Sequence, residues 1–107
     1  MIHVIATIEL RAGTREAFLG EFSSIVPAVR REEGCIEYGA AVDVASGMAA
    51  QIALRPDVVT VVEKWSSLET LAAHAVAPHM QEYRPRVKDY VVRTVLQILE
   101  PVGETVA

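Results

Sequence analysis

Apolar and polar residues alternate along four segments of the chain, and this period of two is typical of β-strands. In the first segment the even-numbered residues from Ile2 to Leu10 are apolar and share one face. Elsewhere, apolar residues recur three and four positions apart, which indicates amphipathic helices. The predicted strands span residues 2–10, 35–44, 58–65 and 90–100, and the predicted helices cover residues 15–31, the segment that begins near residue 67, and residues 78–88.

Local residues predict where these helices begin and end. Thr14 is expected to cap the helix over 15–31 with its side chain, and Gly34 to terminate it. Ser66 and Glu69 have the spacing of a capping box. Pro78 ends one helix and suits the first turn of the next. Residues 45–57 show neither period and are predicted to form a long, mobile connection between two strands.

The predicted order is strand, helix, strand, strand, helix in two pieces, strand, which is the order of a ferredoxin-like split βαβ fold. We therefore expect an α+β protein with a four-stranded antiparallel sheet whose helices cover one face. Alternation places apolar residues on both sides of the last strand, and an antiparallel sheet with one face in water would show a polar side. A second copy that packs sheet to sheet explains this pattern, so a homodimer is predicted. The two predicted sets are Val92, Leu96 and Ile98 on one side, and Val91, Val95 and Leu99 on the other.

The 107 residues fit one domain, predicted over 1–101, with a flexible tail at 102–107. The net charge of −4 argues against a nucleic-acid partner. The single cysteine, Cys35, allows no intrachain disulfide, fits a reducing compartment and is expected to be a small core residue. No signal-peptide pattern and no uncharged stretch of bilayer length are visible, so we expect a cytoplasmic protein that does not insert into membranes.

Several short motifs occur in a characteristic order: Glu33-Gly34-Cys35-x-x-Tyr38, Asp43, Glu63-x-Trp65, His74 and Ala77-Pro78-His79. Together they resemble the antibiotic biosynthesis monooxygenase (ABM) family, over about residues 2–100. The resemblance implies a dimeric α+β barrel. Some members oxygenate phenols, hydroquinones or anthrones with O2 and no metal or flavin, others degrade haem, and others isomerise a phosphorylated sugar-like signal. Haem-degrading members carry an asparagine on the first strand, where this chain has Ala6.

Oxygenation of a phenol needs a base, because the phenolate donates an electron to O2 more readily than the phenol does. Histidine suits this role near neutral pH, so His74 and His79 are the candidate bases, and Glu63 is a candidate to orient one of them. A turn at Pro78 would allow both rings to face one cavity. Three aromatic residues are candidate walls for a flat substrate: Tyr38, Trp65 and Tyr83.

Each candidate also has a purely structural interpretation. Trp65 and Tyr38 suit a core, His74 a buried hydrogen-bonded ring, and His79 a helix start or surface. Glu63 with the two histidines resembles a metal-binding set, but the histidines are five positions apart rather than four, so no metal is expected. The predicted function is cofactor-independent oxidation of a small hydroquinone-like substrate with O2. The alternatives are an isomerase of a small carbonyl or sugar-phosphate-like metabolite and a non-catalytic small-molecule-binding dimer.

Overall fold

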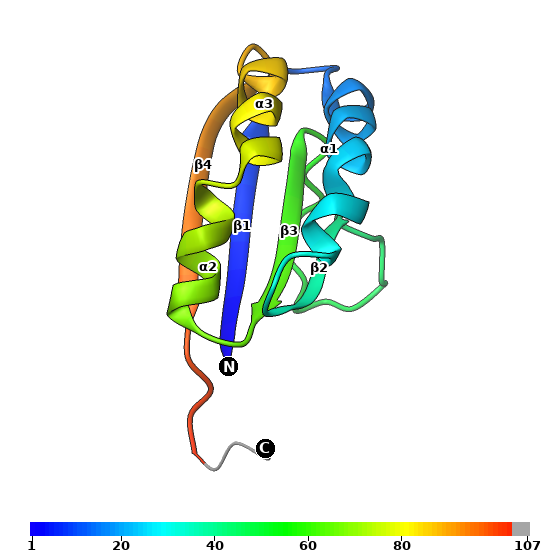
Figure 1. The fold of residues 1–107 in the computed structure, drawn as a ribbon. Coiled ribbons are helices and arrows are strands. Elements are labelled where there is room, and N and C mark those ends of the chain that lie inside the picture. The colour runs from blue at the N-terminus through cyan, green and yellow to red at the C-terminus, as the bar shows by residue number, and fades with distance from the viewer. Residues whose placement is uncertain (104–107) are drawn as a thin grey trace.

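The computed structural model describes residues 1–103 as one antiparallel sheet with helices packed on one face (Figure 1). The strands lie in the order β2-β3-β1-β4, and every neighbouring pair is antiparallel. This arrangement confirms the predicted ferredoxin-like α+β fold. The elements are β1 (Ile2–Leu10), α1 (Arg15–Arg30), β2 (Cys35–Ala41), β3 (Val58–Trp65), α2 (Leu68–Ala75), α3 (Pro78–Val87) and β4 (Val91–Leu99).

The core lies between the sheet and the helices. In β1 and β3 every second residue is buried and the residues between them are half-buried, as the alternating pattern predicts. From the helix side, α1 buries Phe18, Phe22, Ile25 and Val29, which recur at helical spacing. Burial of these apolar side chains is the main force that holds the helices on this face of the sheet.

Two β-bulges change which residues share a face. The pairing of β1 with β4 shifts between Glu9 and Leu10, and that of β2 with β3 shifts between Cys35 and Glu37. An extra residue at a bulge reverses the alternation beyond it. Val91 therefore faces the helices together with Leu96, and Cys35 lies on the same side as Tyr38 and packs against the core. Simple alternation put Val91 on the wrong face, whereas the packing of Cys35 against the core agrees with its prediction as a small core residue.

The helix starts differ from the prediction in detail. The Thr14 side chain makes no capping hydrogen bond to α1, since its hydroxyl donates to a carbonyl oxygen in the preceding turn. The capping box of α2 uses Ser67 and Thr70, one residue later than the predicted Ser66 and Glu69. Ser67 has the extended backbone of an N-cap, and its hydroxyl accepts from the Thr70 amide at 3.2 Å.

The connection between β2 and β3 contains no helix or strand from residue 42 to residue 57. The predicted strand over 35–44 ends earlier, at Ala41. Beyond it the Asp43 carboxylate meets Arg55, whose Nε and Nη2 atoms donate to it at 2.9 Å. These hydrogen bonds lower the pKa of Asp43 to about 2. The Asp43–Arg55 ion pair joins the two ends of this connection. The mobility of the connection stays a prediction.

The last strand ends at Leu99, and residues 100–103 have no regular structure. The rest of the predicted tail lies outside the described residues. Among residues 1–103, no helix has the length and apolar character required to cross a membrane.

Candidate active site

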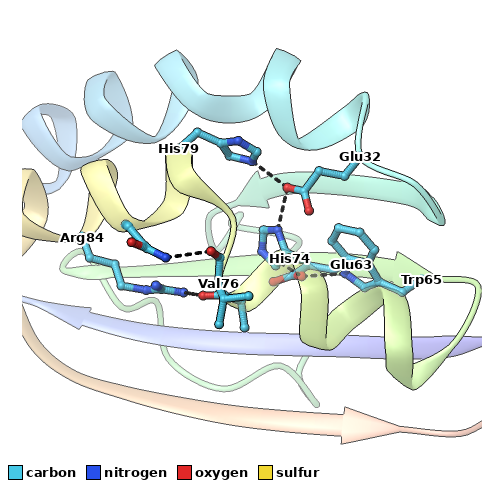
Figure 2. Close-up of polar contacts among 9 residues, drawn as sticks. Glu32, Glu63, Trp65, His74, Val76, His79 and Arg84 are labelled. Atoms are coloured by element: carbon cyan, nitrogen blue, oxygen red, sulfur yellow. Dashed lines mark hydrogen bonds and ion pairs between the residues drawn. The ribbon is translucent and has the colours of Figure 1, made fainter.

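One carboxylate oxygen joins the two candidate histidines (Figure 2). Glu32 Oε2 lies 2.9 Å from His74 Nδ1 and 2.7 Å from His79 Nε2. Glu32 belongs to the turn between α1 and β2, where Gly34 has a φ of +80° and its carbonyl accepts from the Ser66 amide at 2.8 Å. The turn is thereby tied to the start of α2, and Glu32 is held against the histidines.

The break between α2 and α3 brings the two histidines together. On one continuous helix, residues five apart would point in different directions. Here α2 ends at Ala75 and α3 begins at Pro78, so the chain changes direction between the rings. Ala77 provides no side-chain cap for α3, as its sequence suggested. Instead, Arg84 Nη2 donates to the Ala75 carbonyl at 2.5 Å and thereby fixes α3 against the end of α2 (Figure 2).

Glu63 lies on the other side of the His74 ring. Its Oε1 atom accepts from Trp65 Nε1 at 2.8 Å and lies 4.0 Å from His74 Nε2. Glu63 and Trp65 are two positions apart on β3 and therefore share one face of that strand. Burial raises the pKa of the Glu63 carboxyl, although the Trp65 hydrogen bond and His74 oppose this shift. Glu63 thus holds a proton more readily than an exposed carboxylate does.

A cavity of about 1200 Å³ opens between the sheet and the helices, and Glu63 and His74 are part of its wall. Much of the remaining wall is apolar or aromatic. Tyr38 packs edge-on against His74 at 5.4 Å between ring centroids and stacks on Phe22 at 5.3 Å. Burial raises the pKa of the Tyr38 phenol, so this ring stays uncharged. Such a cavity suits a flat, largely apolar ligand with a few polar groups.

The structure places the other predicted residues as follows. Tyr83 lines the cavity from α3 and meets the rings of Phe18 and Phe22 edge-on. Trp65 is completely buried and is not among the lining residues. It lies behind the His74 ring at 4.7 Å between centroids, so it supports the cavity wall rather than forming it. His79 is outside the cavity and reaches the site only through Glu32.

Sequence reasoning missed Glu32. It sits beside Glu33 in an acidic turn before a glycine, a context that usually indicates solvated side chains, and the quoted motif began one residue later. No periodic pattern marks it, because its role depends on a turn that meets α2 and α3 in space. Yet the Glu32 side chain is only 13% exposed and contacts both histidines.

Glu32, His74 and His79 are also the described side chains that could hold a metal ion, since their ligand atoms lie within 4.8 Å of one another. Two ligand atoms bound to one tetrahedral zinc ion lie about 3.4 Å apart, given metal–ligand distances near 2.1 Å. The observed 2.7 and 2.9 Å are shorter and match hydrogen bonds. The cluster thus fits shared protons better than a bound metal.

Comparison with known proteins places this site in a family. Residues 1–86 match the family profile named "Antibiotic biosynthesis monooxygenase". The chain belongs to this family. The ABM protein is 42% identical over 103 residues to the "Probable quinol monooxygenase YgiN" of Escherichia coli, across 94% of this chain and 98% of the relative.

Solved structures share the same fold as the ABM protein. Rv0793 from Mycobacterium tuberculosis superposes with a TM-score of 0.77 at 23% identity, with 98% of each chain covered. PA3566 from Pseudomonas aeruginosa gives a TM-score of 0.78 at 20% identity, with 95% of this chain and 94% of that chain covered. At these identities the likeness bears on the fold alone.

Proposed function

We propose that this ABM protein oxidises a small quinol with O2, without a metal or an organic cofactor, inside the aromatic cavity. The observation that carries the proposal is the buried pair of Glu63 and His74 on the wall of that cavity. Both side chains can accept a proton, and a flat phenolic substrate bound in the cavity would lie against them. The name of the Escherichia coli relative points to the same class of substrate.

The chemistry requires little from the protein beyond proton transfer and an enclosed site. Loss of a proton makes a quinol a better electron donor to O2, and a base within hydrogen-bond reach promotes that loss. A hydroquinone supplies its own electrons, since quinol and O2 yield a hydroxyquinone and water with all atoms balanced. The aromatic walls formed by Tyr38 and Tyr83 would hold the ring and exclude water.

The direct test is oxygen uptake by chelator-treated protein with a panel of benzo- and naphthohydroquinones. We expect uptake faster than the spontaneous oxidation of each quinol in buffer. With 18O2 as the gas, mass spectrometry should find one labelled oxygen atom in the product. A quinone without the label would identify an oxidase instead, and no uptake above the spontaneous rate across the panel would contradict the proposal.

We also propose that the protein is a homodimer that packs through the sheet face opposite the helices. That face carries the apolar residues Ile5 and Val62 on the middle strands and the exposed Val95 and Leu99 on β4, with uncharged polar residues between them. Charged pairs lie at its margins, Glu9 with Arg93 and Glu37 with Lys64. A central area depleted of charged residues with a charged rim is typical of a protein interface.

For the dimer, light scattering of the wild type should give about twice the 11.7 kDa mass of the chain. Val95→Glu should halve the mass, because a twofold axis would bury two carboxylates in an apolar interface. Val76→Glu is the matched control, since Val76 is 66% exposed at the end of α2, away from the sheet. A monomeric wild type would refute the dimer.

A further inference from the structure

We propose that Glu63, His74, Glu32 and His79 form a proton path from the cavity to the protein surface. This inference rests on the proposed quinol oxidation and assigns Glu32, which no sequence motif marked, a role in it. Glu63 is the end that faces the substrate, and His79 is the end that exchanges protons with water.

The four side chains are consecutive in space. Glu63 Oε1 lies 4.0 Å from His74 Nε2, His74 Nδ1 lies 2.9 Å from Glu32 Oε2, and the same oxygen lies 2.7 Å from His79 Nε2. Exposure rises at the far end of the path. The side chains of Glu63, His74 and Glu32 are 8%, 7% and 13% exposed, whereas that of His79 is 28% exposed.

The chemistry of each group suits transfer in this order. An imidazole can accept a proton at one nitrogen and release another from the second, and the His74 ring presents a different nitrogen to each carboxylate. The Glu32 oxygen contacts both rings, so a proton can pass between them through it. The 4.0 Å between Glu63 Oε1 and His74 Nε2 is longer than a hydrogen bond. A shift of about 1 Å in the Glu63 side chain would bring the two atoms within hydrogen-bond distance.

The proposed step moves one proton and no electrons. The substrate O–H bond breaks and an O–H bond forms on Glu63. Glu63 then protonates His74 at Nε2, His74 releases its Nδ1 proton to Glu32, and Glu32 passes a proton to His79, which releases one to water. After one transfer each imidazole carries its proton on the other nitrogen, and a half-turn of each ring restores the starting state. Because the overall reaction releases no net proton, water returns one proton to the reduced oxygen, and electron transfer to O2 remains with the substrate anion.

A purely structural Glu32 would only position the two rings, so the test must separate the two roles. Glu32→Gln keeps a side chain of the same size but removes its ability to carry a proton. We expect the first turnover at about the wild-type rate and later turnovers slower by about tenfold or more, because the proton cannot leave. A structural defect would slow the first turnover equally.

The surface end allows a second test by chemical rescue. His79→Ala should slow steady-state turnover in weakly buffered solution, and added imidazole should restore it in proportion to its concentration. Added imidazole should not rescue Glu32→Gln, because the proton transfer that this variant blocks lies inside the protein, between the two histidines. The matched control is Glu33→Gln, an exposed neighbour in the same turn, which should behave like the wild type. If Glu32→Gln showed the same steady-state turnover as Glu33→Gln, the proposed proton path would be refuted.

A measurement without substrate separates this proposal from the proposed function. The 15N NMR signals of His74 Nδ1 and His79 Nε2 should both move in Glu32→Gln and stay in place in Glu33→Gln, because the Glu32 oxygen contacts both nitrogens. An unchanged signal at either ring in Glu32→Gln would overturn the path even if quinols are oxidised. Changes at both rings without any oxygen uptake would uphold the connection through Glu32 while the quinol proposal failed.

Discussion

Replacing His74 with asparagine is expected to lower kcat for quinol-dependent oxygen uptake by about 10²–10⁴-fold, the range for loss of a general acid–base group. The asparagine amide can take the place of His74 Nδ1 and donate to Glu32, so the local packing is largely kept. The variant loses the nitrogen that faces Glu63 and the ability to titrate. Steady-state oxygen uptake at saturating quinol is the measurement.

The matched control is His3→Asn. His3 is half-buried on β1 and points to the sheet face opposite the helices, so its side chain does not line the cavity. Its replacement should leave kcat unchanged, and light scattering checks that the dimer proposed on this face is intact. Thermal unfolding of both variants checks that they are folded at the assay temperature. A folded His74→Asn protein with wild-type turnover would exclude His74 from the chemistry.

Gly34→Ala is expected to destabilise the protein by about 2–5 kcal/mol. Two costs add up at this position. The φ of +80° is unfavourable for any residue with a Cβ atom, at about 1–2 kcal/mol. The new Cβ would also lie 2.5 Å from Thr70 Cγ2 and 2.6 Å from Ser66 Oγ, and overpacking of this kind costs about 1–3 kcal/mol more.

Gly13→Ala separates these two costs. Gly13 has the same φ of +80°, but nothing lies within 4 Å of the position that a Cβ would take. Its replacement should therefore cost only the backbone strain of about 1–2 kcal/mol. Urea denaturation, with unchanged slopes, measures the difference as a shift of the midpoint. Equal midpoints for the two variants would show that the close contact with α2 does not matter.

Much of the fold could be predicted because it depends on local and periodic features. Alternation located all four strands, helical spacing located α1 and α2, and Pro78 marked the start of α3. The errors occur where one residue changes the register. At the β4 bulge Val91 turned to the helix side, and at the start of α2 the cap moved by one residue to Ser67. Such shifts depend on neighbouring strands and turns, which a periodic pattern does not contain.

The candidate site was predicted only in part. Residue chemistry together with the family resemblance selected His74, His79 and Glu63 as candidates, and suggested that a turn at Pro78 lets both rings face one cavity. It could not show that Glu32 joins the two rings, because that contact links residues 42 and 47 positions apart. It also could not show that Trp65 supports His74 from behind rather than lining the cavity.

The sequence by itself determined the element order, the apolar faces that build the core, and the residue types available for proton transfer. These follow from side-chain period and intrinsic chemistry, which each residue carries locally. Only the tertiary structure decided which carboxylate meets which histidine, which rings face the cavity, and which end of the cluster reaches water. Those properties depend on distances across the fold, set when the turn before β2 packs against α2 and α3.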